Sequence, residues 1–361
     1  MREAAVNLLR NNGFDVDVIT PNYKSKKLIL DTERKVYQIP AHFQSRIYGY
    51  FEKIGFYEDY LDNWVKAAFD FLKNRVNKDD ILFATIGGEL GPIKLGSLLK
   101  RATGCKFVIN FRDPLDYSWV NGLKLNSKFH VSRERQEQKY YKNADLIICS
   151  SKVNASSLKH KYPQWTSLIQ TNYFGYTEQV SLSTCYPPVE LRIVYGGNFA
   201  QEQSPELLAY ILEQIPDVQA SFIGKFRNYK PIKPYLDTYE FVENLPVNEY
   251  RKFLCERASI GFVSLADDYL GACVPSKIYE YINLGLPMLG ALPNGDAMDI
   301  INNCGYGIAC HYTDHKGLVN AVKKFQNRDI LLEYRNTILK DRDKWMMKEL
   351  IKDLVGWLNK I

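Results

Sequence analysis

Short apolar runs alternate with stretches of helical periodicity through the first half of the chain. Helical spacing of apolar residues covers 2–11 and 91–102, and strand-like runs lie at 15–19, 81–85, 106–110 and 145–149. Apolar strands that alternate with helices of about 10–15 residues are typical of parallel β-α-β units. The first half is therefore predicted to form a parallel sheet with helices between its strands.

The same alternation restarts in the second half. Strands are predicted at 192–196, 219–223, 240–242, 259–264 and 287–292. Helices are predicted at 205–214, 247–256, 276–284 and 316–326. Parallel sheets of this kind bind ligands at the carboxyl ends of their strands. The residues that follow each strand are therefore the candidates for chemistry.

This pattern divides the chain into two Rossmann-like α/β domains. The first is expected over residues 1–172, a linker without periodicity over 173–190, and the second domain over 191–339. Residues 340–361 have apolar positions at helical spacing. The alternation of strands and helices in the second domain ends near residue 326, so the apolar face of this last helix needs a partner surface elsewhere. The terminal helix is therefore predicted to cross back onto the first domain.

Composition indicates a globular chain with an uneven charge. Hydrophobic residues make up 46% and charged residues 24%, which is enough apolar surface to offset the entropy of ordering. Residues 1–170 contain 27 Lys and Arg against 18 Asp and Glu, and the aromatic-rich, helix-like stretch 46–76 lies among them. This basic half indicates an anionic partner, such as a phospholipid surface or a phosphorylated substrate. A solvated charged surface is the alternative.

Signals for targeting, membrane spanning and metal binding are absent from the sequence. No apolar run approaches the ~20 residues of a transmembrane helix, and the first residues lack the apolar core of a secretory signal. The five histidines show no HExxH spacing and the seven cysteines no CxxC pair. Neither a metal site nor a disulfide framework is predicted, and a cytoplasmic protein is expected. The basic residues are dispersed, which disfavours nucleic acid as a partner.

The most informative segment is PSKIYEY at residues 275–281, which is followed by the helix-ending Gly285. Pro and Ser before a helical run are helix-start signals, and the free N–H groups of a first turn form an anion site. Ser276 can cap this turn, and Lys277 adds the positive charge that a diphosphate would require. Glu280 lies one turn deeper, where a carboxylate can accept hydrogen bonds from a ribose diol. The alternative is an ordinary capped helix with a Lys277–Glu280 ion pair.

Glycines follow two strands of the second half. The run VYGGNF places Gly196, Gly197 and Asn198 after one strand, and FIGK places Gly224 after the next. Glycines at such ends allow the backbone to approach a ligand closely. Many β-α turns carry glycine, so a single glycine turn is weak evidence for a ligand site. The recurrence of glycines after several strands, at one expected edge of the sheet, is stronger evidence.

Charged residues follow two strands of the first half. Arg112 and Asp113 come directly after KFVIN, and Glu89 follows ILFAT after two glycines. Asp113 can accept a proton from a hydroxyl group or orient it, and Glu89 can contact hydroxyl groups. The alternatives are that Asp113 caps a turn while Arg112 pairs locally, and that Glu89 belongs to the start of the next helix.

The order of these motifs resembles that of a known enzyme family. YGGNF, FIGK, FVENLPVNEY, VPSKIYEYINLGLPMLG and GYGIA succeed one another in the second half, and NFRDPLDY and ADLIICSSK stand in the first. This order is similar to that of the retaining nucleotide-sugar glycosyltransferases of family four, over nearly the whole chain and most specifically in PSKxxEY…GxP. The resemblance implies the GT-B fold, in which two Rossmann-like domains face each other across a cleft.

The resemblance also implies roles for the candidates in the second domain. Glu280 matches the second carboxylate of a Glu-x7-Glu pattern, which binds the donor ribose. Ser276 and Lys277 match positions that cradle the donor diphosphate, and Gly197 matches the glycine turn below it. Donor binding is therefore expected at these residues together with their neighbours Gly196, Asn198 and Gly224.

In the first domain, the loop of Arg112 and Asp113 matches one that bears a residue near the acceptor and the donor sugar. The expected catalytic residues are Asp113, Arg112 and Lys277, and the expected acceptor-side residues are Glu89, Arg112 and Asp113. Transfer in the resembled family is usually independent of metal, and no cofactor beyond the donor substrate is implied.

Three departures from the family pattern are visible. Ala272 stands where the first glutamate of Glu-x7-Glu is expected. Asn198 and Gln203 stand where many relatives carry the Arg and Lys that grip the diphosphate. The chain also begins inside what looks like the first helix, so the strand and glycine-rich turn that usually precede it are expected to be missing.

The expected activity is retaining, hexosyltransferase-type transfer of a sugar from a nucleoside diphosphate sugar to an acceptor hydroxyl. The acceptor would be a saccharide or lipid-linked saccharide of surface polysaccharide or lipopolysaccharide synthesis, at an anionic membrane surface on the cytoplasmic side. The alternatives are a nucleotide-sugar epimerase or phosphorylase of the same architecture, and a non-catalytic partner subunit with this fold.

Overall fold

The computed structural model describes residues 2–41, 51, 58–115, 128–181, 188 and 190–361. The chain forms two compact units. The N-terminal domain comprises Arg2–Tyr173 together with Ile351–Ile361, and the C-terminal domain comprises Phe174–Leu350. Most of the expected linker is outside the described residues or belongs to the C-terminal domain, where Tyr176 forms a β-bridge with Met346.

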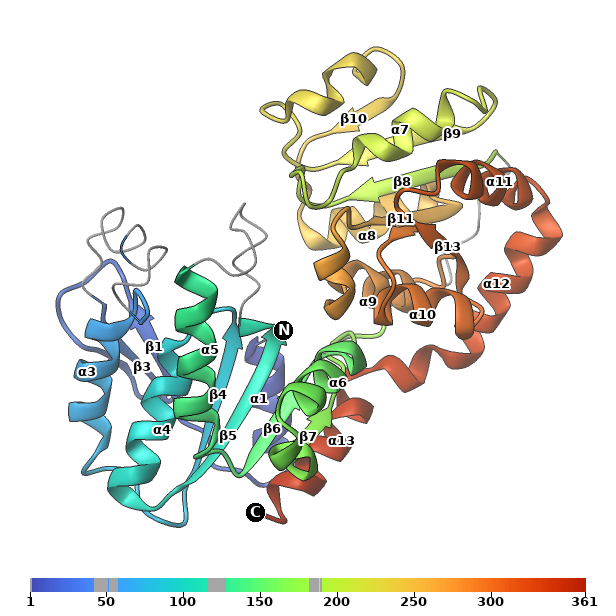
Figure 1. The fold of residues 1–361 in the computed structure, drawn as a ribbon. Coiled ribbons are helices and arrows are strands. Elements are labelled where there is room, and N and C mark those ends of the chain that lie inside the picture. The colour runs from blue at the N-terminus through green and yellow to red at the C-terminus, as the bar shows by residue number, and fades with distance from the viewer. Residues whose placement is uncertain (1, 42–50, 52–57, 116–127, 182–187, 189) are drawn as a thin grey trace. The chain divides into compact units, whose positions relative to one another are not determined.

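The N-terminal domain is built around a parallel sheet of four strands in chain order (Figure 1). Its strands are β4 (Ile81–Gly87), β5 (Lys106–Asp113), β6 (Leu146–Cys149) and β7 (Ile169–Thr171). Alternate side chains of β5 point to opposite faces, and buried apolar residues lie on both, with Phe107 and Ile109 on one face and Val108 on the other. Both faces of the sheet are therefore covered by helices, as a parallel sheet requires.

Different helices cover the two faces. Phe107 and Ile109 pack on one face with α4 (Gly91–Thr103), α5 (Lys128–Tyr141) and α6 (Lys152–Lys161). Val108 packs on the other face with α1 (Arg2–Asn11) and with Leu354 and Leu358 of α13 (Met347–Leu358). The predicted crossing of the terminal helix onto the first domain is confirmed.

A second, three-stranded sheet lies beside α3 in this domain. Its strands are β1 (Val18–Asn22), β2 (Ile29–Asp31) and β3 (Val36–Pro40), in the order β1-β3-β2. Helix α3 (Asp62–Leu72) packs on β3 through a buried face that includes Trp64. Residues 46–50 and 52–57 of the expected helix at 46–76 lie outside the described residues, and Trp64 lies in the core.

The C-terminal domain contains a six-stranded parallel sheet in the order β10-β9-β8-β11-β12-β13. Its strands are β8 (Arg192–Gly196), β9 (Gln219–Ile223), β10 (Glu240–Val242), β11 (Ile260–Ser264), β12 (Met288–Leu292) and β13 (Gly307–His311). Strands β8 to β12 match the sequence prediction closely, because buried parallel strands appear as continuous apolar runs. The predicted α/β fold class is confirmed for both domains.

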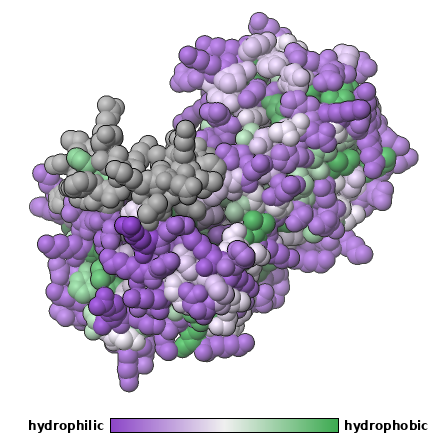
Figure 2. Space-filling model, viewed as in Figure 1, coloured by the Kyte–Doolittle hydropathy of each residue, from purple (hydrophilic) through white to green (hydrophobic). Residues whose placement is uncertain are grey.

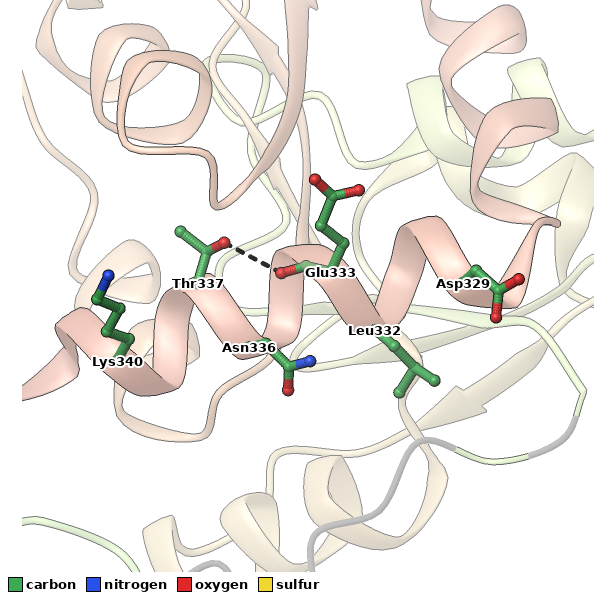
Figure 3. Close-up of a pocket in the computed structure, with 6 residues that line it drawn as sticks. All are labelled: Asp329, Leu332, Glu333, Asn336, Thr337 and Lys340. Atoms are coloured by element: carbon green, nitrogen blue, oxygen red, sulfur yellow. Dashed lines mark hydrogen bonds between the residues drawn. The ribbon is translucent and has the colours of Figure 1, made fainter.

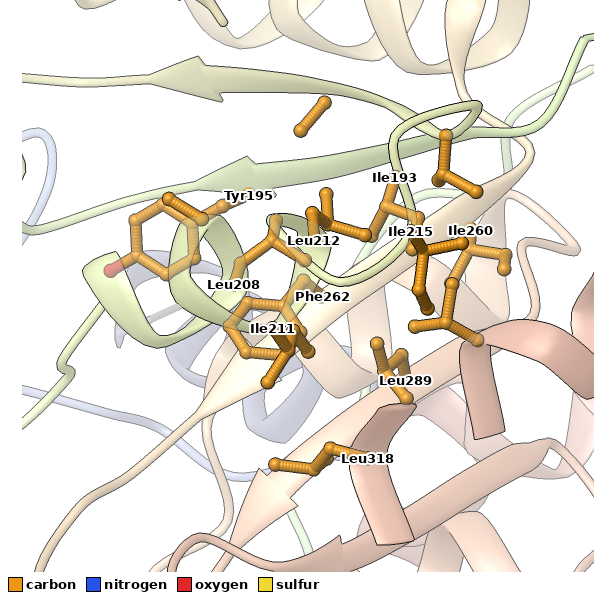
Figure 4. Close-up of a cluster of buried hydrophobic side chains, with 14 of the residues drawn as sticks. Ile193, Tyr195, Leu208, Ile211, Leu212, Ile215, Ile260, Phe262, Leu289 and Leu318 are labelled. Atoms are coloured by element: carbon orange, nitrogen blue, oxygen red, sulfur yellow. The ribbon is translucent and has the colours of Figure 1, made fainter. Parts of the chain in front are cut away.

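Helices cover both faces of this sheet as well. Ile193 and Phe262 pack in the core on one face (Figure 4), under α7 (Glu206–Leu212), α11 (His315–Phe325) and α12 (Arg328–Asp341). On the other face, α9 (Ser276–Asn283) contacts β11, and Tyr250 of α8 (Val247–Arg257) lies against Gly196 at the end of β8. There a Cβ on Gly261 would lie 2.5 Å from the Tyr281 ring, so glycine lets α9 pack closely on β11.

The remaining elements correct several expectations. Helix α12 follows residue 326, so the alternation of the second domain does not close there, and the helix expected over 340–361 begins only at Met347. Cys255 is disulfide-bonded, which the scattered cysteine spacing did not predict. The elements not yet named are η2 (Pro163–Leu168), η3 (Lys230–Tyr235), η4 (Asp268–Ala272), α10 (Asp296–Asn303) and η5 (Arg342–Trp345).

Hydrophilic residues predominate on the face of the molecule drawn in Figure 2. Among the described residues, no helix has the length and apolar character needed to cross a bilayer.

Candidate functional site

The turns after β8 and β9 bring the expected glycines together. Gly197 and Gly224 have φ angles of 147° and 146°, which side-chain-bearing residues rarely adopt. A Cβ on Gly224 would lie 2.2 Å from the carbonyl oxygen of Gly197. Gly196 lies against Tyr250 of α8, where a Cβ would come within 2.4 Å of the hydroxyl oxygen. Both turns therefore depend on glycine, for conformation and for close approach of the backbone.

The amino group of Lys277 is buried beside the first of these turns. Its Nζ lies 3.8 Å from the centre of the Tyr195 ring, and a Cβ on Gly197 would come within 2.9 Å of its Cε. Nζ is shielded from solvent and has no hydrogen-bond partner among the described residues. The first turn of α9 thus holds an amino group between an aromatic face and a glycine turn.

The burial of Lys277 changes its protonation. Removal from water disfavours the ammonium form, and burial lowers the pKa of Lys277 to about 7. A ring face attracts a cation. The Tyr195 ring nevertheless supplies neither the hydrogen bonds of water nor the negative charge of a carboxylate. An anion at this position would satisfy the amino group and raise its pKa again.

Glu280 is held from the neighbouring helix. Arg251 of α8 donates from Nε to Oε1 at 2.6 Å and from Nη2 to Oε2 at 3.2 Å. This two-point geometry fixes the plane of the carboxylate and leaves other lone pairs free to accept hydrogen bonds. The Lys277–Glu280 ion pair of the alternative interpretation is therefore wrong, because Glu280 pairs with Arg251.

Two other expected positions differ from the prediction. Pro275, not Ser276, is the N-cap of α9, and no side-chain cap forms there. Ser276 is the first residue of the helix and is exposed. Asn198 contributes its backbone carbonyl, which accepts a hydrogen bond from the Tyr195 hydroxyl.

The loops after β11 and β12 interlock at the same edge of the sheet. A Cβ on Gly271 would lie 2.2 Å from the carbonyl oxygen of Asn294, and one on Gly295 would lie 2.1 Å from that of Gly271. Ala272, which replaces the first expected glutamate, ends η4 in this loop. The sequence analysis did not identify this contact, because it joins two glycines 24 positions apart.

In the N-terminal domain, two of the expected carboxylates border one glycine. A Cβ on Gly87 would lie 3.4 Å from Oδ2 of Asp113 and 3.6 Å from Oε2 of Glu89. Glu89 accepts a hydrogen bond of 2.7 Å from the backbone N–H of Gly87. The carbonyl of Arg112 accepts one of 2.6 Å from Ser150. The carboxyl ends of β4 and β5 therefore bring Glu89 and Asp113 together, and Arg112 precedes Asp113 in the same strand.

A buried ion pair fixes the loop that carries Glu89. Asp59 accepts hydrogen bonds from the backbone N–H of Leu61 at 2.9 Å and of Leu90 at 2.8 Å. Its carboxylate also lies 3.3 Å from the guanidinium of Arg133, with both side chains almost fully buried. Burial raises the pKa of Asp59 against the attraction of Arg133. Sequence reasoning missed this pair, which joins residues 74 positions apart.

The hollow along α12 brings together none of the expected residues. It is lined by residues of this helix alone, and Thr337 donates a hydrogen bond of 3.0 Å to the carbonyl of Glu333 there (Figure 3). Over the described ranges, no group of three or more His, Cys, Asp or Glu residues could hold a metal ion.

Comparisons with known proteins identify the fold of the chain. No family model matches the chain, and no curated protein matches it significantly. Among solved structures, the lipopolysaccharide outer core galactosyltransferase WaaB is similar over 100% of this chain and 95% of its own, with a TM-score of 0.68 and 11% identity. The chain has the GT-B glycosyltransferase fold.

Two further structures with this fold are similar to the chain. Sucrose-phosphate synthase from Thermosynechococcus elongatus matches 99% of this chain and 91% of its own, with a TM-score of 0.67 and 15% identity. HepE from Anabaena, in complex with UDP-glucose, matches 91% of this chain and 87% of its own, with a TM-score of 0.65 and 11% identity. The GT-B domains expected from the motif order are confirmed.

Proposed function

We propose that the chain is a glycosyltransferase that moves a hexosyl group from a nucleoside diphosphate sugar to an acceptor hydroxyl, with retention and without a metal. The C-terminal domain binds the donor, and the N-terminal domain supplies the acceptor side. The fold shared with a galactosyltransferase and with HepE, whose structure holds UDP-glucose, supports this reading.

The observation that carries the proposal is the buried amino group of Lys277, which has no hydrogen-bond partner in the described part of the chain. A buried polar group without a partner is costly, so such a group persists where a ligand satisfies it. A diphosphate beside Gly197 would pair with Nζ and favour its ammonium form. The departing diphosphate gains negative charge, which the ammonium and the helix N-terminus stabilise.

The remaining donor residues have complementary roles. The glycine turns of Gly196, Gly197 and Gly224, with Asn198, let the backbone approach the phosphates, and Ser276 lies at the start of α9. Glu280, oriented by Arg251, accepts hydrogen bonds from the ribose hydroxyls. Arg251 thus joins the donor site as a positioning residue.

On the acceptor side, Asp113 orients or deprotonates the attacking hydroxyl, with Arg112 and Glu89 binding nearby groups. We propose a saccharide or lipid-linked saccharide as acceptor, in surface polysaccharide or lipopolysaccharide synthesis. The basic N-terminal half supports an anionic membrane surface as the place of reaction, on its cytoplasmic side.

Calorimetry with UDP tests the donor site. We expect wild-type protein to bind UDP and Lys277→Ala to bind it at least tenfold more weakly, because the diphosphate loses its buried cation. Glu280→Gln should weaken binding by ~1–3 kcal/mol through lost hydrogen bonds. Release of UDP from UDP-glucose in the presence of acceptor saccharides then tests transfer.

Arg251→Gln is the matched control for Glu280→Gln, since both remove the same ion pair but only one removes the carboxylate. Glu280→Gln should therefore weaken UDP binding more than Arg251→Gln does. Unchanged affinity in both Lys277→Ala and Glu280→Gln, with the fold intact, would overturn the assignment. Binding of UDP without turnover of any donor would favour the non-catalytic subunit.

A further inference from the structure

Exposed apolar side chains gather in one short segment of the N-terminal domain. Among the described residues, seven large apolar side chains are strongly exposed, and four of them lie within 23–30. The exposed fractions are 54% for Tyr23, 40% for Leu28, 44% for Ile29 and 50% for Leu30. Single exposed apolar residues are ordinary, but a contiguous group marks an interaction surface.

The position of β2 explains this exposure. Among the strands that the structure describes, β2 is an edge of the three-stranded sheet and pairs with β3, antiparallel. Consecutive side chains of a strand point to opposite faces. Exposure of Leu28, Ile29 and Leu30 in succession therefore means that both faces are uncovered at this edge.

Three lysines precede the strand on a tight turn. The side-chain oxygen of Asn22 accepts hydrogen bonds from the backbone N–H of Lys24 at 2.9 Å and of Ser25 at 3.1 Å. Lys24, Lys26 and Lys27 are exposed, and none forms an ion pair within the described part of the chain. No acidic residue stands between them and the apolar strand. Unpaired cations thus adjoin an uncovered apolar edge.

We propose that residues 23–30 dock the protein on an anionic lipid bilayer. Leu28, Ile29 and Leu30 enter the boundary between headgroups and acyl chains, and the lysines contact lipid phosphates. Charge complementarity selects this occupant. A second copy that paired along β2 would bring two sets of lysines together, and edge lysines oppose such pairing. Apolar side chains on both sides of a strand also suit a fluid boundary better than one flat protein face.

This inference deepens the proposed membrane-side acceptor, and its test uses no sugar donor, so each can fail separately. The full chain is sedimented with vesicles of equal parts phosphatidylcholine and phosphatidylglycerol, or of phosphatidylcholine alone, at low and high salt. We expect binding to the anionic vesicles that weakens with salt. The triple variant Lys24→Gln, Lys26→Gln, Lys27→Gln should lose about fivefold in partitioning per lysine.

A second variant removes the apolar component of the surface. Leu28→Ser, Ile29→Thr and Leu30→Thr together should abolish the binding that persists at high salt, since that part depends on apolar insertion. Circular dichroism checks that the exposed substitutions leave the fold intact.

The matched control is Lys316→Gln, Lys323→Gln, Lys324→Gln, which removes the same charge from exposed positions of α11. It should bind nearly as wild type. Equal losses in the two lysine variants, or no binding of wild-type protein to anionic vesicles at low salt, would overturn the proposal. A concentration-dependent dimer that the apolar variant abolishes, without vesicle binding, would instead identify a second copy as the occupant.

Discussion

A lysine on the first turn of a helix is ordinarily solvated, but Lys277 is enclosed between the Tyr195 ring and Gly197. Its neighbours leave the amino group without a carboxylate or a hydrogen-bond acceptor among the described residues. Burial of this amino group therefore destabilises the folded chain. Such a cost at the end of β8 is consistent with a site completed by its ligand.

The pH dependence of stability should report this burial. Folded Lys277 loses its proton near pH 7, whereas an unfolded lysine keeps it to about pH 10.4. Between these values the unfolded chain binds more protons, so Lys277 makes stability rise with pH, by at most about 1.4 kcal/mol per unit. Lys277→Met removes this contribution to the pH dependence of stability. The substitution should therefore stabilise the folded chain most at pH 7 and below. Denaturant unfolding at pH 7 and 9 measures this.

The matched comparison is Lys316→Met, which changes an exposed lysine in the same domain. Its effect on stability should be small and independent of pH over this range. An equal gain from Lys277→Met at both pH values would contradict the burial of a neutral amine.

The sequence indicated which residues approach one another only where they share a local motif. Lys277, Glu280 and the strand-end glycines follow from helix-start and turn signals close in the chain. The pairing of Arg251 with Glu280 depends on how two helices lie on one sheet face, which no local spacing encodes. The Tyr195 ring under Lys277 depends in the same way on the end of β8.

At the scale of elements, the glycine turns connect the sheet to the proposed donor site. Gly224→Ala would combine a positive φ with a Cβ 2.2 Å from the carbonyl of Gly197. We expect the free energy of unfolding to fall by about 1–3 kcal/mol from backbone strain alone. We also expect weaker UDP binding. Thermal unfolding and calorimetry measure the two effects.

Gly356 of α13 provides the opposite case for the same substitution. No atom lies within 4 Å of a Cβ added there, and the residue is inside a helix. Gly356→Ala should therefore stabilise by up to about 1 kcal/mol, since alanine is the better helix former. Similar destabilisation by the two substitutions would show that the clash at Gly224 is not the cause.

The predictability of an element followed its burial pattern. Strands β8 to β12 of the C-terminal sheet were predicted to within a residue or two, because their residues are mostly buried. Helix α5 was missed because its sequence, KFHVSRERQEQKYY, is mostly polar. It is fixed by Tyr140 and Tyr141 in the core and by the Arg133–Asp59 pair, and none of these gives a helical apolar stripe.

At the scale of the molecule, the two domains depend on the chain in different ways. The C-terminal domain is one continuous segment, whereas the N-terminal domain is completed by Ile351–Ile361. Ile351, Leu354 and Leu358 are buried against Val108 and neighbouring residues of the N-terminal sheet. A substitution in the last helix should therefore change the stability of strands that lie more than 200 positions earlier in the chain.

Leu354→Ala tests this dependence. Truncation of a buried leucine typically costs about 2–5 kcal/mol, and here we expect the loss to fall on the N-terminal domain. Hydrogen exchange followed by mass spectrometry should show faster exchange in β5 and β6 and unchanged exchange in β8 and β11. Asp353→Ala, at an exposed position of the same helix, should alter neither domain. Equal acceleration in both sheets would mean that the helix supports the whole chain and not one domain, because the cluster around Leu354 includes residues of β4, β5 and β6 and, among the described residues, none of β8 or β11.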